Sequence, residues 1–226
     1  MARALAPAPR CSIRTILRTD PGIAGTGPQG AIRYPAGVSP ARRAVFLDRD
    51  GVVNDVVWRD GTPVAPLRAD ELVIHPDVAR QVGRLHDHGW VTIVVTNQPD
   101  VARGLLAPEV LAAINAAMTE QAGVAHVYAC THDGVEDCAC RKPRPGMLLD
   151  AARDLDLDLA GSWLVGDRWV DIAAGNAAGV RSILLDRDYS WAPTSSGAPA
   201  ADLEPALRVG SLAEAVDAII DATAAD

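Results

Sequence analysis

The chain has 226 residues, of which 49% are apolar and 4% aromatic, and its formal net charge is −8 at pH 7. This length and apolar content allow one large domain whose core is built mainly from Val, Leu, Ile and Ala. The acidic charge argues against a partner among nucleic acids, because sequence-independent binding to them needs a positive surface. No apolar run is long enough to span a bilayer, so we expect a cytoplasmic protein without a membrane partner.

The first 42 residues differ from the rest of the chain in charge and composition. Residues 1–43 hold seven arginines and a single acid, Asp20, so they carry +6 and the remainder carries −14. They are rich in Pro, Gly and Ala without sustained periodicity, which is typical of disordered segments. We therefore expect a disordered tail over 1–42 and one folded domain over 43–226. Two alternatives stay open for the tail: an over-extended reading frame, and an arginine-rich targeting helix over 11–18.

The folded part alternates segments of strand type and helix type. An apolar run at 44–47 predicts the first buried strand, and the glycine and prolines of 52–70 predict a loop after it. Further strands are expected at 90–95, 125–129, 162–165 and 180–185, and helices at 77–88, 108–122, 145–154, 170–178 and 211–223. Residues 188–203 are typical of an irregular surface loop. Strands that alternate with helices predict an α/β fold with a doubly wound parallel sheet.

Polar side chains follow the ends of the predicted strands. In chain order they are Asp48 and Asp50, Thr96 and Asn97, Lys142, and Asp167 and Asp171. Ligands of such sheets bind beyond the carboxyl ends of the strands, so we expect these side chains to share one crevice. Two acids at one strand tip repel each other unless a cation lies between them, which favours a hard divalent metal over the alternative of a solvated acidic turn.

A second cluster combines three of the four cysteines with a histidine. Its members fall within eleven residues and are Cys130, His132, Cys138 and Cys140. Thiolates and imidazole at this density suit tetrahedral Zn²⁺, and four protein ligands leave no open position, so we expect a structural zinc site. A disulfide is the main alternative, disfavoured because the chain shows no secretion signal. Zinc would stiffen the loop 130–140 and so position Arg141 and Lys142 beside it.

Together these motifs resemble those of haloacid-dehalogenase (HAD) superfamily phosphatases, within the branch of heptose-bisphosphate and histidinol-phosphate phosphatases. The resemblance covers 44–185, and the matching segments are 48–54 (DRDGVVN), 96–98 (TNQ), 102–104 (ARG), 138–143 (CACRKP), 165–168 (VGDR) and 171–172 (DI). It implies a HAD-like sheet. Only 45 residues separate Asp50 from Thr96, which leaves no room for a large helical cap. We therefore expect loops to supply specificity, at about 54–60, 97–104 and 130–142.

The resemblance implies a phosphoric monoester hydrolase that works through an aspartyl-phosphate. Asp48 would attack phosphorus, and Asp50 would protonate the leaving alcohol and then activate water. Mg²⁺ would be held by Asp48, the backbone carbonyl of Asp50 and Asp167. Asp171 would either bind the metal through water or orient Lys142. The residues expected to bind phosphate or substrate are Thr96, Asn97, Gln98, Arg103, Arg141, Lys142 and Arg168.

The expected partner is a small phosphorylated metabolite, and the protein is expected to be a monomer. Arg59, Arg103 and Arg141 are candidates to meet a second anionic group. The branch implies removal of the 7-phosphate from D-glycero-D-manno-heptose 1,7-bisphosphate, with histidinol phosphate as the alternative substrate. A non-catalytic binding module organised by zinc is the alternative from a different class. One departure concerns Pro99, which stands where many relatives have serine and cannot donate a backbone hydrogen bond to phosphate.

Overall fold

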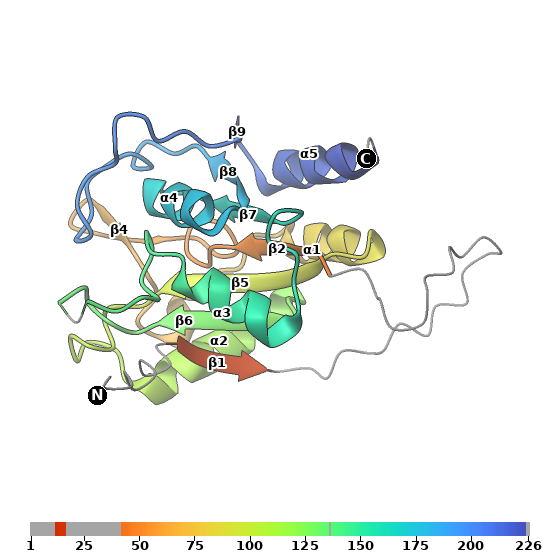
Figure 1. Cartoon of the computed structure of the whole chain (residues 1–226). Helices are drawn as coiled ribbons and strands as arrows, with labels where there is room; N and C mark the ends of the chain where they lie inside the picture. Colours follow the sequence, from red (N-terminus) through yellow and green to blue (C-terminus); the bar gives the residue numbers. More distant parts are fainter. Residues whose placement is uncertain (1–11, 17–41, 136, 225–226) are drawn as a thin grey trace, which may run out of the picture.

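The computed structural model describes residues 12–16, 42–135 and 137–224 (Figure 1). In these residues the strands form one seven-stranded sheet and a separate two-stranded hairpin. The sheet contains β1 (Ser12–Ile16), β2 (Ala44–Leu47), β5 (Val91–Asn97), β6 (His126–Cys130), β7 (Trp163–Gly166), β8 (Arg181–Leu185) and β9 (Leu207–Val209). The hairpin consists of β3 (Val57–Arg59) and β4 (Thr62–Val64).

The order of the strands in the sheet is β1-β6-β5-β2-β7-β8-β9. All neighbours from β6 to β9 are parallel, and only β1 is antiparallel to its partner. The chain builds outward from β2 through β5 to β6, then returns to the other side of β2 and builds outward again. Ligands of such sheets bind where this direction reverses, beyond the carboxyl ends of the strands. Here that point lies between β2 and β7, and the doubly wound prediction is confirmed.

Helices cover both faces of the sheet (Figure 1). They are α1 (Val78–Asp87), α2 (Pro108–Ala122), α3 (Gly146–Leu155), α4 (Trp169–Ala178) and α5 (Leu212–Ala224). Val45 and Leu47 of β2 join a core cluster with α1, α2 and α5, whereas Ala44 and Phe46 join one with α3 and α4. Successive residues of a strand point to opposite faces of the sheet. Because helices cover both faces, all four residues of β2 are buried, and its sequence is apolar at every position.

The structure corrects part of the prediction for the tail. Ser12–Ile16 form β1, paired antiparallel with β6 so that Ser12 lies opposite Cys130. Neither a disordered segment nor a targeting helix holds for these five residues. The physical reason is that β6 would otherwise end the sheet with unpaired backbone groups, which a further strand can satisfy. Residues 1–11 and 17–41 lie outside the described residues.

The expected loop over 52–70 contains more structure than the sequence indicated. Beside the β3–β4 hairpin it includes a short 3₁₀ helix, Ala69–Glu71. Asp60 and Gly61 form the turn with φ of 49° and 72°, the positive values that a tight hairpin turn requires. Between β2 and β5 the described chain has only these pieces and α1, and no large cap is present. Among the described helices, none combines the length and apolarity needed to cross a membrane.

Candidate active site

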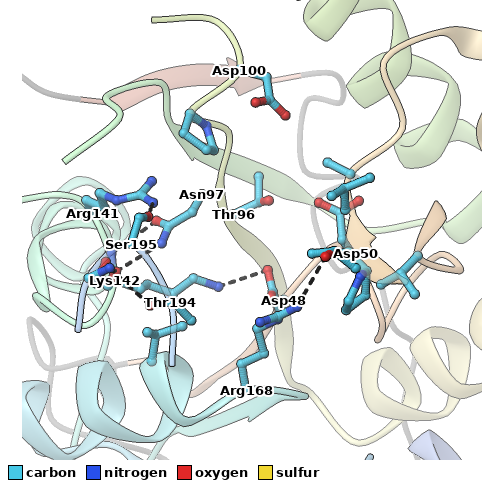
Figure 2. Close-up of a pocket in the computed structure, with 18 of the residues that line it drawn as sticks. Asp48, Asp50, Thr96, Asn97, Asp100, Arg141, Lys142, Arg168, Thr194 and Ser195 are labelled. Carbon is cyan, nitrogen blue, oxygen red and sulfur yellow. Dashed lines mark hydrogen bonds and ion pairs between the residues drawn. The ribbon is translucent and has the colours of Figure 1, made fainter. Parts of the chain in front are cut away.

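The carboxyl ends of the central strands open into a cleft of about 400 Å³ (Figure 2). Eight of the residues predicted for the site line it: Asp48, Asp50, Thr96, Asn97, Arg103, Arg141, Lys142 and Arg168. Two segments that sequence reasoning did not assign to the site also line it, residues 62–65 at and just after β4 and residues 193–196 of the loop between β8 and β9. The cleft therefore combines polar strand ends with a rim of loops.

Asp48 and Lys142 form the centre of the cleft, where Lys142 reaches toward Asp48 (Figure 2). The Lys142 ammonium lies 2.8 Å from Asp48 Oδ1 and 2.5 Å from Asp171 Oδ1, and it donates to the Val95 carbonyl at 2.8 Å. An ammonium has three donors, so all three are engaged. Burial works to lower the pKa of Lys142, but the carboxylates of Asp171 and Asp48 outweigh it and raise the pKa. Lys142 therefore stays charged and fixes the orientation of Asp48.

Three buried acids lie close together, and the Lys142 ammonium is paired with two of them, Asp48 and Asp171. Oxygen atoms of Asp48, Asp167 and Asp171 all lie within 4.8 Å of one another. Burial raises the pKa of Asp48 to about 7, with Lys142 opposing the shift and Asp171 adding to it. Burial and the charge of Asp48 likewise raise the pKa of Asp167 well above its usual value. The single positive charge of Lys142 does not balance three carboxylates, and a divalent cation would neutralise the excess negative charge.

The hydrogen bonds of these acids show which of them has an oxygen to offer a cation. Asp167 Oδ2 accepts a hydrogen bond of 2.7 Å from the Tyr189 hydroxyl, whereas Oδ1 is buried and has no hydrogen-bond partner among the described residues. Asp171 uses Oδ1 on Lys142 and Oδ2 on the backbone N–H of Arg168, at 3.1 Å. Of the two roles left open for Asp171, the geometry thus favours orienting Lys142.

Gly51 allows the chain after β2 to pass close to Asp167. Its φ is +90°, and a Cβ added to it would lie 1.9 Å from Asp167 Oδ2. Any side chain here would displace the carboxylate, so the glycine is required both for the turn and for the close approach.

Asp50 is held by four donors. Arg49 contacts both of its oxygens at 3.1 Å, Asn54 Nδ2 donates to Oδ1 at 3.0 Å, and Gln98 Nε2 donates to Oδ2 at 2.8 Å. Arg49 is fully buried and also donates to Asn115 at 2.9 Å. This network fixes the orientation of the Asp50 carboxyl group. Sequence reasoning gave no role to Arg49 and Asn54, although both lie inside the segment 48–54.

Two residues predicted to bind substrate direct their amides elsewhere. The Gln98 side chain is fully buried, and its amide donates to Asp50 and to Thr96 Oγ1, the latter at 2.9 Å. Asn97 lines the cleft, but its Nδ2 donates to the Lys142 carbonyl and its Oδ1 accepts from the Lys142 N–H, both at 3.0 Å. In this structure both residues position the groups around the cleft. The Thr96 hydroxyl accepts from Gln98 and keeps its own proton available for a ligand.

The arginines predicted to meet a second anionic group differ in their surroundings. Arg59 is paired with Glu71 at 2.6 Å and is not part of the cleft lining, so the structure does not support its predicted role. Arg103 lines the cleft and contacts Asp100 at 3.2 Å. Arg141 also lines the cleft, is almost fully buried, and donates to the His132 carbonyl at 3.0 Å and to Ser195 Oγ at 2.9 Å.

Arg168 approaches the cleft from the start of α4. Its guanidinium lies 4.9 Å from the ring centroid of Tyr189 and donates to the Pro63 carbonyl of β4 at 3.3 Å. The ring of Trp58 in β3 meets the same tyrosine edge to face, with centroids 5.9 Å apart. Sequence reasoning missed Tyr189, because no local pattern marks a single aromatic residue in an irregular loop.

The Cys/His cluster begins with Cys130, the last residue of β6. Cys130 Sγ is 3.8 Å from Cys138 Sγ and 3.4 Å from Cys140 Sγ, and His132 Nδ1 is 3.4 Å from the sulfurs of both Cys130 and Cys140. Sulfurs joined in a disulfide would be ~2.05 Å apart, so Cys130 forms no disulfide with Cys138 or Cys140. Hydrogen bonding from Cys140 is the largest of the effects that lower the pKa of Cys130 to about 5. A thiolate is the form that binds a metal.

Comparison with known proteins assigns the chain to one family. Residues 139–215 match the HAD-hydrolase-like family. The D-glycero-beta-D-manno-heptose-1,7-bisphosphate 7-phosphatase of Bordetella bronchiseptica is 39% identical over 142 residues, which cover 61% of this chain and 76% of that protein. The D-glycero-alpha-D-manno-heptose-1,7-bisphosphate 7-phosphatase of Burkholderia mallei is 39% identical over 170 residues, covering 69% and 87%.

The fold leads to the same family. The crystal structure of the D,D-heptose 1,7-bisphosphate phosphatase of Bordetella bronchiseptica, in complex with magnesium and phosphate, matches this structure with a TM-score of 0.66 at 32% identity. The match covers 80% of this chain and 99% of that one. The alternative of a non-catalytic binding module is thereby set aside. The chain belongs to the HAD-like hydrolases, in the family of the D-glycero-D-manno-heptose-1,7-bisphosphate 7-phosphatases, and it is a phosphatase.

Proposed function

We propose that this phosphatase removes the 7-phosphate of D-glycero-D-manno-heptose 1,7-bisphosphate with the help of Mg²⁺ and through an aspartyl-phosphate on Asp48. The observation that carries the proposal is the meeting of Asp48, Asp50 and Lys142 in one cleft at the switch point of the sheet. Relatives that share this fold act on this heptose bisphosphate.

The acid cluster fits Mg²⁺. Asp48 and Asp167 would hold the ion together with the backbone carbonyl of Asp50, and Asp167 Oδ1 is a buried oxygen without a hydrogen-bond partner in the described chain. Carboxylate and carbonyl oxygens are the ligands that Mg²⁺ prefers. When bound, the ion supplies positive charge that reduces the repulsion between the carboxylate of Asp48 and a phosphate dianion.

Asp48 is the proposed nucleophile. Its Oδ1 accepts from the backbone N–H of Arg49 at 2.7 Å and contacts Lys142 at 2.8 Å. With Oδ1 held in this way, Oδ2 is the oxygen that attacks phosphorus. A bond forms between Oδ2 and phosphorus while the bond from phosphorus to the substrate oxygen breaks. Lys142 keeps Asp48 oriented for this step, and its charge opposes the rise in the pKa of Asp48 that burial causes.

Asp50 is the proposed acid and base. It gives a proton to the departing alcohol oxygen, and then takes a proton from the water that cleaves the aspartyl-phosphate, which releases phosphate and restores Asp48. Four hydrogen bonds from Arg49, Asn54 and Gln98 fix the position of the Asp50 carboxyl group in the cleft for both steps.

The cleft has groups for both ends of a bisphosphate. Thr96 can donate its hydroxyl proton to the phosphoryl group that reacts. Arg103, Arg141 and Arg168 line other parts of the same cleft and can pair with a second phosphate. A volume of about 400 Å³ suits one small phosphorylated sugar.

The Cys/His cluster fits a structural zinc ion. Four ligands at tetrahedral zinc distances are ~3.8 Å apart for two sulfurs and ~3.6 Å for a sulfur and a nitrogen. Four of the six observed separations are 3.4 to 3.8 Å, and all six are within 4.8 Å. Zinc bound by Cys130, His132, Cys138 and Cys140 would fix the loop whose carbonyl at His132 holds Arg141. Metal analysis of the reduced protein is expected to find about one zinc per chain, and its absence would exclude the site.

A substrate panel tests the proposed function. Phosphate release is measured at saturating Mg²⁺ for the alpha and beta anomers of the heptose 1,7-bisphosphate, for heptose 7-phosphate and for histidinol phosphate. We expect kcat/KM to be at least tenfold higher for one anomer of the bisphosphate than for the other compounds. Equal or faster hydrolysis of histidinol phosphate would overturn the substrate assignment and leave the phosphatase class unchanged.

A further inference from the structure

We propose that Tyr189 is a positioning residue that keeps one oxygen of Asp167 away from the magnesium ion, so that Asp167 binds the ion through Oδ1 alone. The inference rests on the proposed magnesium site, and it concerns a residue in the loop after β8, outside the segments 48–172 whose motifs point to a phosphatase. Its consequence is a preference of the site for Mg²⁺ over Ca²⁺.

The two oxygens of Asp167 have opposite surroundings. The Tyr189 hydroxyl donates to Oδ2 at 2.7 Å, a distance typical of a strong hydrogen bond between a hydroxyl and a carboxylate. Gly51 packs against the same oxygen, since a Cβ there would lie 1.9 Å from Oδ2 and 3.0 Å from the Tyr189 hydroxyl. Oδ1 is buried without a hydrogen-bond partner in the described residues. One oxygen is thus covered by protein, and the other is left for a cation.

The tyrosine hydroxyl acts as a donor. It lies 2.7 Å from Asp167 Oδ2, and an ionised carboxylate can only accept hydrogen bonds. Tyr189 is absent from the residues that line the cleft. Its hydroxyl is directed at Asp167, so we expect the hydroxyl to affect the reaction only through that carboxylate.

The ring of Tyr189 is held by contacts that do not involve its hydroxyl. Arg168 lies over the ring at 4.9 Å from the centroid, and Trp58 meets it edge to face at 5.9 Å. Phenylalanine can keep both contacts. Tyr189→Phe therefore removes the hydrogen bond to Asp167 and leaves the ring in place.

The hydrogen bond matters for metal choice because the two ions use carboxylates differently. Mg²⁺ takes six ligands in a nearly ideal octahedron, whereas the larger Ca²⁺ takes six to eight and accepts both oxygens of one carboxylate. A carboxylate with one covered oxygen can give Mg²⁺ the single oxygen ligand that it needs. It cannot give Ca²⁺ both oxygens. Without the tyrosine proton, Asp167 can turn and offer both oxygens.

The experiment measures metal binding without turnover. The substrate-free full-length protein, dialysed without a chelator so that the Cys/His cluster is undisturbed, binds Mn²⁺, and electron paramagnetic resonance follows its displacement by Mg²⁺ and by Ca²⁺. In Tyr189→Phe we expect Mg²⁺ affinity to fall about tenfold, the lower end of what loss of a hydrogen bond to a metal ligand costs. Ca²⁺ affinity should stay constant or rise, so the ratio of the two dissociation constants shifts at least tenfold.

Two further variants make the result decisive. Tyr128→Phe removes another buried tyrosine hydroxyl, which donates to Asp154 at 3.3 Å away from the cleft, and should leave the ratio unchanged. An unchanged ratio in Tyr189→Phe overturns the inference, and so does an equal loss of affinity for both ions, which marks a general structural effect. If Asp167→Asn binds Mn²⁺ as well as the wild type does, the magnesium site itself is wrong, and the inference fails with it.

Discussion

The part of the chain that the structure describes contains two clusters of potential metal ligands, and they are assembled in opposite ways. The acids of the cleft come from segments far apart in the chain, Asp48 after β2 and Asp167 after β7, and the sheet brings them together. The Cys/His cluster comes from eleven consecutive residues that begin with Cys130 at the end of β6, and the loop between its members includes Val135, which is 85% exposed. Packing of the sheet brings the acids together at an electrostatic cost. The three cysteines are buried beside α3, whereas the loop around Val135 has little packing, and we expect that loop to depend on zinc for its structure.

Replacement of the proposed nucleophile, Asp48, tests the acid cluster and is expected to have the largest effect on kcat. Asp48→Asn keeps the size of the side chain and removes the attacking oxygen, so kcat should fall at least ~10⁴-fold, as for other nucleophiles acting in concert with a base. The same change removes one of three crowded negative charges, so the metal-free variant should melt no lower than the wild type. Phosphate release and thermal unfolding are measured in parallel. Asp217→Asn, on exposed α5 and paired with Arg84, is the control and should retain full activity. Wild-type rates in Asp48→Asn would contradict the mechanism.

Loss of a thiol ligand tests the other cluster. Cys138→Ser should lose the zinc and loosen the loop that holds Arg141 through the His132 carbonyl, while the sheet stays folded. We expect kcat/KM to fall about 100-fold, the upper range for loss of the supports of an active site. Hydrogen exchange should increase over 131–141 and stay unchanged in β2 and β7. A variant that loses zinc but retains both protection of the loop and activity would show that the loop is stable without the ion.

Burying these acids without a cation is unfavourable, so the stability of the metal-free protein should depend on pH. The pKa of Asp48 is about 7 in the folded protein against a usual 3.8, so the buried group prefers to be protonated. The contribution of Asp48 to the free energy of unfolding is fully present below about pH 4. It is lost as the pH rises through 7, a change of at most about 4 kcal/mol. Metal-free protein should therefore melt lower at pH 8 than at pH 5, and Mg²⁺ should raise the melting temperature more at pH 8. An equal Mg²⁺ effect at both values would show that these acids do not bind the ion.

The same contrast explains what could be predicted from the sequence. The apolar run 44–47 followed by Asp48 and Asp50 is a local pattern, and a general rule of parallel sheets then places Asp48 near Asp167. The thiol cluster is more local still. The partners of polar groups were harder to predict, because Asn97 has the chemistry of a phosphate ligand, yet its amide is bound to the backbone of Lys142, 45 residues away.

Short and irregular segments were the other source of error. The strands β3, β4 and β9 have three residues each, too few for a periodic pattern, although Asp60-Gly61 is a recognisable turn signal. Tyr189 contacts Asp167 only because the loop after β8 folds back over the end of β7, which no pattern in that loop indicates.

The smallest expected effect concerns the rim, where the loop after β8 meets the loop of the thiol cluster. Ser195 Oγ accepts a hydrogen bond of 2.9 Å from Arg141, whose other contact is the His132 carbonyl at 3.0 Å. Ser195→Ala removes one of the two supports, and a lost hydrogen bond of ~1 kcal/mol corresponds to about a fivefold change. We expect KM for the heptose bisphosphate to rise by about that factor with kcat unchanged.

Two comparisons separate this positional effect from a general disturbance of the cleft. A substrate without the second phosphate does not need Arg141, so its KM should be the same in Ser195→Ala and in the wild type. Ser195→Thr retains a hydroxyl and should retain the KM of the wild type for the bisphosphate. If Ser195→Ala raised KM equally for both substrates, Arg141 would not be the group that receives the second phosphate, and the rim would owe its specificity to Arg103 or Arg168, which line the same cleft.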